Sequence, residues 1–304
     1  MSVDPARVDT VGSWSVQKHQ LLGGYLEARR LVMKEQAWCR DDHYIDAFAG
    51  SGNPVLNDAE ELRYIAGSPR VALGLQNPFS TYTFIEMETW RVDQLKLLKS
   101  EFPERRISVV QGDCNRVIVE KVTPRIRREH FNRGFVFLDP FGVNLAWDTI
   151  AAIAETQALE IFLNFPTMGL NRAALHNDPD SLDPDKIEKM NRVWGSEDWR
   201  NRLYTRKLGL FGVHEVKIEP TSAERLARLF VEHRLSTVFP HVTDPIPMYN
   251  SYGAPIYCLI FAGHNETGAR IASHILGRQS RQPIPSRPRR RTVPAGTIQL
   301  SLTG

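Results

Sequence analysis

Five apolar, strand-like stretches of this sequence end in polar or turn-forming residues, and helix-like stretches separate most of them. This alternation is the main constraint on the fold, because strands joined by helical crossovers form a parallel sheet covered by helices. The run at 134–142 is apolar almost throughout, as is typical of a central parallel strand. The five predicted strands are residues 43–50, 81–86, 107–113, 134–142 and 158–166.

The sequence therefore predicts an α/β, doubly wound, Rossmann-like fold whose mostly parallel sheet ends in an antiparallel β-hairpin. The hairpin comprises residues 244–250 and 255–264, on either side of the turn-forming segment SYGA. A polar stretch at 167–212 is too long for a simple connection. We expect it to be a helical insertion that shapes a substrate mouth, or else a decorative subdomain or a contact between subunits. One domain spans residues 1–277, and residues 278–304 form a tail.

The net charge of +3 is unevenly distributed along the chain. Residues 278–304 contain six arginines and no acidic residue, so this segment carries +6 and the remainder carries −3. The segment is also rich in proline, which disfavours packing and predicts disorder. It fits either a contact with nucleic-acid phosphates or a solvated tail without a partner.

The cysteines indicate a protein of a reducing compartment. Cys39, Cys114 and Cys258 are odd in number and widely spaced, so the sequence predicts neither a disulfide framework nor a metal site. The histidines lack the paired spacing of a zinc site. No apolar run is long enough to cross a bilayer, and the N-terminus has no signal-peptide pattern. We therefore expect a cytoplasmic protein without a membrane contact.

The first predicted strand runs into a turn of small residues, DAFAGSG. Asp46 precedes this turn, and Phe48, Ala49, Gly50 and Gly52 form it. Small residues let the backbone approach a ligand closely. The turn lacks one glycine of the dinucleotide fingerprint, and no clear helix follows it to bind a pyrophosphate. The segment is either a cofactor-binding turn or a tight turn without a ligand.

Acidic residues also end the second and third predicted strands. Glu86 is placed to accept hydrogen bonds from the ribose hydroxyls of an adenosine, with Glu88 as a competing candidate. Asp113, followed by Cys114, is placed to accept from the adenine amino group, while Gly112 leaves space for the ring. The alternatives are a solvated carboxylate for Glu86 and a helix cap for Asp113, which is compatible with adenine binding.

The fourth strand ends in the most specific motif, LDPFG at 138–142. A methyl donor carries its own leaving group, so the enzyme mainly has to align the nucleophile. The Asp139 carboxylate and the Pro140 carbonyl can accept the hydrogens of an amino group on a planar base, and Phe141 can stack on a base that is flipped out of a duplex. These three residues are the predicted catalytic group. The alternative is a rigid turn, because Asp-Pro and Phe-Gly form turns.

Further residues are candidates for the acceptor pocket and its surroundings. The expected substrate-binding residues are Gly142, Asn164, Phe165 and Arg172. An amphipathic helix near the N-terminus offers Lys18 as a ligand or pocket contact, together with Trp14 and Tyr25, whose aromatic rings also suit core or lid packing.

Taken in order, these motifs resemble the three-Cys-motif partner family between residues 14 and 277. The segments that carry the resemblance are W…K, YIDAFAGSG, GSP, YTFIE, GDCN, FVFLDPFG, NFP…NR and IYCLIFAGH. The resemblance implies a class I methyltransferase fold and S-adenosylmethionine (SAM) as cofactor. It also implies a genomically paired protein with a three-cysteine, radical-SAM-like motif as a partner.

Within this resemblance, Asp46, Gly50 and Gly52 border the methionine part of the cofactor, Glu86 meets the ribose and Asp113 the adenine. The DPFG of residues 139–142 also resembles the fourth motif of tRNA guanine-N2 dimethyltransferases and, more loosely, the DPPY of adenine-N6 enzymes. Phe-Gly in place of Pro-Tyr argues against adenine N6 as the target atom and leaves an exocyclic amine in general.

The leading hypothesis is a SAM-dependent methyltransferase that acts on an exocyclic nitrogen of a base in RNA or DNA. Two alternatives remain open at this point: a methyltransferase-like binding subunit that works with the three-Cys-motif partner, and a small-molecule methyltransferase.

Overall fold

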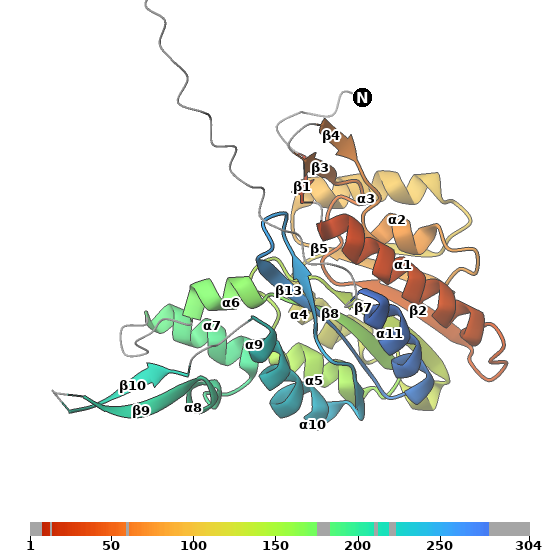
Figure 1. The fold of residues 1–304 in the computed structure, drawn as a ribbon. Helices are drawn as coiled ribbons and strands as arrows, with labels where there is room; N and C mark the ends of the chain where they lie inside the picture. The colour runs from red at the N-terminus through yellow and green to blue at the C-terminus, as the bar shows by residue number, and fades with distance from the viewer. Residues whose placement is uncertain are drawn as a thin grey trace, which may run out of the picture.

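The computed structural model describes residues 8–12, 14–58, 61–174, 183–209, 212–218 and 223–279. These residues fold around an eight-stranded sheet of order β11-β13-β8-β7-β2-β5-β6, with β12 also paired to β13 (Figure 1). Strands β2, β5, β6, β7 and β8 run parallel, and β13 runs antiparallel to β8, which confirms the predicted fold. The strands are β2 (Asp41–Asp46), β5 (Thr81–Glu86), β6 (Ile107–Gln111), β7 (Asn132–Leu138), β8 (Leu159–Phe165), β11 (His241–Val242), β12 (Ile246–Tyr249) and β13 (Pro255–Gly263).

The strand order reverses next to β2. The chain moves outward from β2 to β5 and β6, then returns to β7 on the other side of β2. Asp46, the last residue of β2, pairs with Phe84 of β5 and with Phe137 of β7. Doubly wound sheets bind ligands beyond the carboxyl ends of their strands at such a reversal. The fold therefore places a candidate site beyond the ends of β2 and β7.

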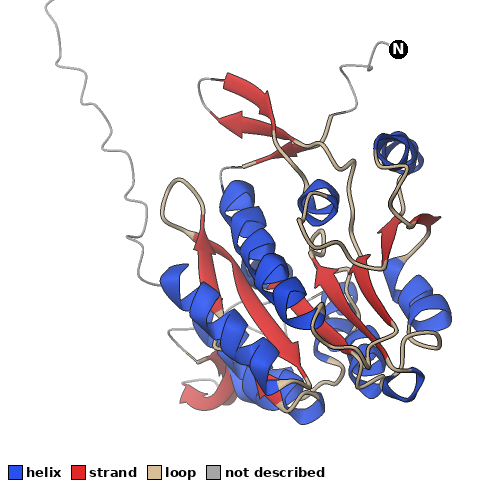
Figure 2. Ribbon diagram, turned by 90° about the vertical axis from the view of Figure 1, so that its right-hand side faces the viewer, coloured by secondary structure: helices blue, strands red, loops and turns tan. Residues whose placement is uncertain are grey.

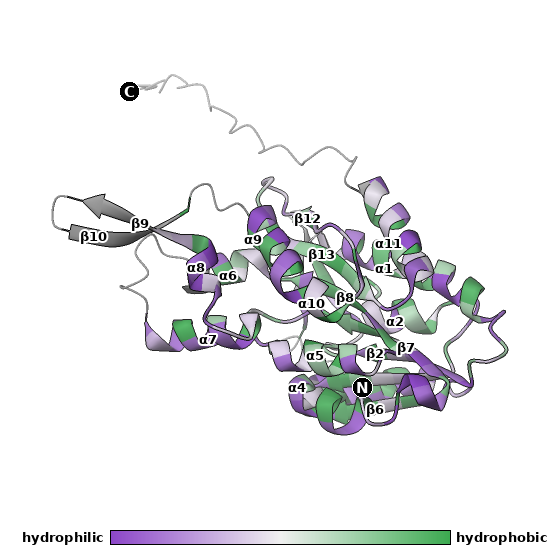
Figure 3. Ribbon diagram, turned by 90° about the horizontal axis from the view of Figure 1, so that it is seen from below, coloured by the Kyte–Doolittle hydropathy of each residue, from purple (hydrophilic) through white to green (hydrophobic). Residues whose placement is uncertain are grey.

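Helices cover both faces of the sheet, as the apolar strands require (Figure 2). Strand β7 shows the pattern, because Phe135 and Phe137 pack on one face and Val136 and Leu138 on the other. On the Phe135 face lie α1 (Trp14–Met33), α2 (Ser68–Leu73), α3 (Thr89–Glu101) and α11 (Glu266–Gln279). On the opposite face lie α4 (Cys114–Val117), η1 (Ile118–Val122), α5 (Trp147–Glu155) and α9 (Ala223–Phe230), which continues through η4 (Val231–Leu235) into α10 (Ser236–Val238). Figure 3, coloured by hydropathy, accordingly shows hydrophobic residues in green along strands of the sheet.

Two strand pairs are additions to the sequence-based expectation. Strands β3 (Val55–Asp58) and β4 (Glu61–Tyr64) form a small sheet with β1 (Thr10–Val11). The insertion contains α6 (Thr167–Ala174), α7 (Pro184–Trp194) and α8 (Trp199–Leu203), as expected, but it continues into β9 (Tyr204–Gly209) and β10 (Gly212–Lys217). These two strands form an antiparallel ribbon that projects from the body (Figure 1). The insertion therefore extends past residue 212 and is only partly helical.

Residues 280–304, which include most of the predicted basic tail, lie outside the described residues. Across the part of the chain that the structure describes, no helix combines the length and the apolar character needed to cross a membrane.

Candidate functional site

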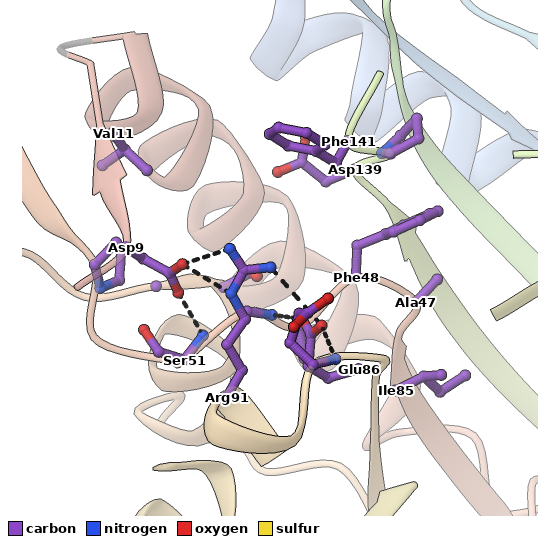
Figure 4. Close-up of a pocket in the computed structure, with 18 of the residues that line it drawn as sticks. Asp9, Val11, Ala47, Phe48, Ser51, Ile85, Glu86, Arg91, Asp139 and Phe141 are labelled. Atoms are coloured by element: carbon purple, nitrogen blue, oxygen red, sulfur yellow. Dashed lines mark hydrogen bonds and ion pairs between the residues drawn. The ribbon is translucent and has the colours of Figure 1, made fainter. Parts of the chain in front are cut away.

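A cavity of about 430 Å³ opens beyond the carboxyl ends of β2, β5, β6 and β7, at the reversal of strand order. Its size lies within the range of small-molecule and cofactor pockets. The first turn of α1 and Tyr257 of β13 complete the lining. Figure 4 shows Glu86, Arg91, Asp9 and Ser51 linked on one side, with Asp139 and Phe141 on the other. Three of the four predicted carboxylates thus share one cavity, namely Glu86, Asp113 and Asp139.

The small-residue turn after β2 lines this cavity with its backbone. Gly50 and Gly52 have φ angles of 61° and 80°, a region that other residues rarely adopt. A Cβ atom on Gly52 would lie 2.9 Å from Cδ2 of Leu98. Phe48 and Ala49 also line the cavity, and the Ala49 amide donates to the Ile85 carbonyl at 3.0 Å. The turn therefore needs glycine both for its conformation and for its packing.

Glu86 holds the turn in place with its carboxylate, which is 8% exposed. Its Oε2 accepts a hydrogen bond from the Gly50 amide at 2.9 Å. Its Oε1 accepts from the amides of Met87 and Glu88 at 2.8 and 2.9 Å. A carboxylate has about four acceptor positions, so Oε2 keeps one position for a ligand hydroxyl. Glu88 caps the start of α3 with its backbone and lines the cavity beside Glu86.

Asp9 and Arg91 add a charged pair that the sequence did not indicate. Asp9 precedes β1, and its Oδ2 accepts from the Ser51 amide at 2.9 Å. Arg91 donates from Nε to the Asp9 Oδ1 at 2.8 Å, and its Nη1 lies 3.8 Å from Oε1 of Glu86. These contacts connect the N-terminal segment, the glycine turn and α3 around one side of the cavity (Figure 4). Neither residue belongs to a recognisable motif, and only the fold brings them together.

Asp113 begins α4 and also faces the cavity, so its two proposed roles are compatible. Its Oδ1 accepts from the amide and from Nδ2 of Asn115, both at 2.9 Å. Asn115 in turn donates to the Asn144 carbonyl at 2.9 Å and ties this turn to the loop after β7. Cys114 lines the cavity as a buried thiol, and burial raises its pKa to about 12. Cys114 is therefore a packing residue that is protonated at neutral pH.

Asp139 is held between two side chains from distant parts of the chain. Its Oδ2 forms an ion pair and hydrogen bond with Nζ of Lys18, from the first turns of α1. Its Oδ1 accepts from Nδ2 of Asn164, in β8, at 2.7 Å. Burial alone would raise the pKa of Asp139, but the Lys18 ammonium and these hydrogen bonds outweigh burial and lower it below the ordinary value. Asp139 is therefore an oriented anion at the cavity wall.

The residues that follow Asp139 carry an aromatic ring into solvent. Phe141 lines the mouth of the cavity and is 84% exposed, which is unusual for so large an apolar side chain. Gly142 has a φ of 69° and lies against a small apolar pocket rather than the main cavity. Pro140 borders both hollows. The DPFG turn thus presents one carboxylate inside the cavity and one free ring at its entrance.

Besides Gly142 and the fully buried Asn164, two more predicted contact residues do not line the cavity. Asp46 is fully buried behind the cavity wall, where Tyr44 donates to its Oδ2 at 3.1 Å, so it does not line the cavity. Phe165 is also buried and stacks on Phe230 with ring centroids 4.6 Å apart, which makes it a core residue rather than a substrate contact. Both residues end apolar strands, and their strand positions point these side chains inward. The side chain of Arg172 lies outside the described part of the structure.

Two unpredicted residues complete the wall near Asp139. His19 is buried next to Lys18, and burial followed by the Lys18 charge lowers its pKa to about 3, so the ring is neutral. Tyr257 comes from β13. Among the described residues, no group of three or more His, Cys, Asp or Glu side chains could hold a metal ion.

The strand order and the antiparallel end strand are those of a Rossmann-like methyltransferase fold. No protein-family model and no curated protein sequence matches the chain. Among solved structures, a Legionella pneumophila protein of family DUF519 is 14% identical, with 90% of this chain and 94% of that one covered and a TM-score of 0.48. A Thermotoga maritima spermidine synthase is 12% identical over 90% of this chain and 68% of its own, with a TM-score of 0.42. A Streptococcus thermophilus rRNA methylase is 11% identical over 82% and 95%, with a TM-score of 0.33. These are distant likenesses.

Proposed function

We propose that this protein is a SAM-dependent methyltransferase whose acceptor is an exocyclic amino nitrogen of a nucleic-acid base. The observation that carries the proposal is the Asp139 carboxylate, which Lys18 and Asn164 hold at the wall of the cavity while Phe141 stands exposed at its mouth. An aligned carboxylate and a free aromatic ring are what a planar amine acceptor needs.

The residues on the opposite side of the cavity fit the adenosyl cofactor. The glycine turn presents its backbone to the cavity, Glu86 keeps an acceptor position for a ribose hydroxyl, and Asp113 can accept from an adenine amino group. When bound, SAM supplies an electrophilic methyl group. In this assignment Asp46 acts indirectly, because it supports the turn from behind through a hydrogen bond with the Phe48 backbone.

Asp139 would position the acceptor rather than remove its proton. A carboxylate whose pKa is lowered by Lys18 stays ionised at neutral pH and accepts hydrogen bonds from an amino group. The Pro140 carbonyl follows in the chain and is the second predicted acceptor. Two acceptors fix the plane of the amine, so that its lone pair points into the cavity. Lys18 and Asn164 act through Asp139 and are positioning residues.

The decisive experiment compares Asp139→Ala with the wild-type protein. A tritiated-methyl transfer assay is run against total RNA, genomic DNA and the purified three-Cys-motif partner, and SAM binding is measured by calorimetry. We expect transfer to RNA or DNA to fall by a factor of about 10² or more in the variant, since aligned groups contribute at this scale. SAM affinity should stay within about threefold of wild type, because the cofactor residues lie across the cavity.

The alternatives predict different results in the same assay. Normal methylation by Asp139→Ala rejects the proposed mechanism. SAM binding without transfer to any nucleic acid, together with binding of the partner protein, would favour the binding-subunit hypothesis. The control variant is Lys96→Gln, because Lys96 is exposed on the solvent side of α3. It should methylate as wild type does, which shows that a substitution outside the cavity does not lower activity.

A further inference from the structure

A second hollow of about 290 Å³ lies at the opposite edge of the sheet from the methyltransferase cavity. Its lining comes from the end of α1, the loop before β2, the starts of β7 and β8 and the residues after β13. All of these segments lie at the amino edge of the parallel strands. Trp38, Arg128 and Arg133 line the hollow, and the pair Arg40 and Phe131 adjoins it. We name the surface that these five residues form the amino-edge site.

The amino-edge site contains cations that lack acidic partners. Arg40, Arg128 and Arg133 have no carboxylate within 4.0 Å among the described residues. Glu160 also lines the hollow, but its Oε2 is occupied by the Nε of buried Arg29 at 2.7 Å. The hollow therefore keeps an excess of positive charge that is available to an anion.

The same site exposes two aromatic rings, each with a guanidinium group beside it. Trp38 is 45% exposed, and the Arg133 guanidinium lies 4.4 Å from its ring centre. Phe131 is 51% exposed, and Arg40 lies 5.6 Å from its ring centre. The two pairs are adjacent, because Trp38 and Arg40 are two residues apart, as are Phe131 and Arg133, and the Arg40 amide donates to the Phe131 carbonyl at 2.9 Å. Phe131 also holds a left-handed backbone with φ of 56°, which is uncommon for a bulky residue.

We infer that the amino-edge site binds a single-stranded segment of nucleic acid, with bases stacked on Trp38 and Phe131 and phosphates at Arg40, Arg128 and Arg133. Single strands are bound by aromatic stacking platforms interleaved with cations. An acidic polypeptide would use the arginines but has no need of the exposed rings. This inference rests on the proposed function, and it assigns the acceptor a second anchor far from the reacting base.

The geometry sets the length that a base-stacked acceptor needs to use both sites. Helix α1 runs from Trp14 at the cavity to Met33 at the amino-edge hollow, and its 20 residues span about 30 Å. At the helical rise of 3.4 Å per nucleotide, this distance needs about nine nucleotides. An acceptor of four nucleotides can occupy one site only, while one of 16 can occupy both.

Binding is tested by fluorescence anisotropy with labelled single-stranded oligonucleotides of 4 and 16 nucleotides. Trp38→Ala should weaken the Kd for the 16-mer by about 5- to 150-fold, the range that corresponds to one lost stacking contact. Trp38→Phe keeps a stacking face and should stay within a few-fold of wild type. Arg128→Gln with Arg133→Gln should lower the salt slope of log K by about 1.4, which corresponds to two lost phosphate contacts on a single strand.

The charge-matched control is Lys96→Gln with Lys99→Gln on α3, away from the amino-edge site. This pair should leave the Kd of the 16-mer within about twofold of wild type. The inference is overturned if Trp38→Ala binds as wild type does, or if the lysine pair weakens binding as much as the arginine pair. It is also overturned if poly-glutamate competes as strongly as an unlabelled 16-mer.

Methyl transfer separates the failure of this inference from the failure of the proposed reaction. With a 16-mer acceptor, Trp38→Ala should raise KM and leave kcat unchanged, whereas a 4-mer should show no difference between variant and wild type. Transfer that is independent of Trp38 at both lengths rejects the amino-edge site alone. Trp38-dependent binding with no transfer to any nucleic acid rejects the reaction and keeps the site.

Discussion

At the scale of single residues, the contact between Lys18 and Asp139 keeps the Asp139 carboxylate ionised at the cavity wall. Without the ammonium, burial would be the main influence on the carboxylate and would raise its pKa. In Lys18→Met we therefore expect kcat/KM for methyl transfer to gain an acidic limb that wild type lacks between pH 5 and 8. Activity should recover as the pH rises, because Asp139 then ionises.

The check is a pH profile of methyl transfer for Lys18→Met, Lys18→Arg and wild type. Arginine keeps the positive charge, so Lys18→Arg should keep the flat profile even if its rate is lower. A pH-independent loss of activity in Lys18→Met would mean that Lys18 acts on geometry and leaves the charge of Asp139 unchanged.

Asp46 gives a second prediction at this scale, through stability. Burial raises its pKa to about 7, against hydrogen bonds from Ser68 and Tyr44, whereas an unfolded aspartate has a pKa near 3.9. Between these values the folded chain holds a proton that the unfolded chain has released, so this group lowers stability as the pH rises from about 4 to about 7. Asn cannot ionise and removes this dependence.

We expect the free energy of unfolding of Asp46→Asn, relative to that of wild type, to be higher by about 2–3 kcal/mol at pH 8 than at pH 5. Urea denaturation at the two pH values measures the difference. Asp93→Asn on the exposed side of α3 serves as the control and should show no such change. Parallel pH curves for Asp46→Asn and wild type would show that Asp46 is ionised in the folded protein at pH 5.

At the scale of elements, the sequence predicted the sheet better than the site. The parallel strands are apolar on both faces, so β5 was predicted at its exact limits and β7 within a few residues. Strands β9 and β10 were missed because they pair only with each other and their sequence is largely polar. Strand ends located Glu86, Asp113 and Asp139 but not Asp9 or Arg91, since side chains from separate elements meet only after folding.

Two glycines test the elements that carry them. Gly52→Ala places a Cβ atom 2.9 Å from Leu98 in a left-handed turn, so we expect a loss of about 1–3 kcal/mol of stability and weaker SAM binding. Gly24→Ala, in the exposed interior of α1, meets no atom closer than 4.0 Å and should gain about 0.5–1 kcal/mol. Thermal denaturation and calorimetry with SAM measure both effects, and equal behaviour of the two variants would contradict this account of the turn.

At the scale of the whole molecule, acidic and basic groups lie in different regions of the chain. Carboxylates line the cavity beyond the strand ends, whereas residues 278–304 carry six arginines without an acidic residue and arginines line the amino-edge hollow. A nucleic-acid acceptor would then be held by cations outside the cavity and offered to Asp139 at its mouth. Binding of the acceptor and methyl transfer at the cavity should therefore respond independently to salt.

Removal of residues 280–304 tests this division, because the segment carries five arginines and no acidic residue. If each arginine contacts a phosphate, the salt slope of log K for a single strand should fall by up to about 3.5, and KM for a nucleic-acid acceptor should rise. SAM affinity and kcat at saturating acceptor should not change, since the cavity is complete within the described residues. A full-length variant in which all five arginines are replaced by Gln provides the comparison. It removes the charge of the segment and keeps its length. Unchanged affinity and salt slope in both forms would assign the tail no part in binding and leave the amino-edge site as the remaining cationic anchor.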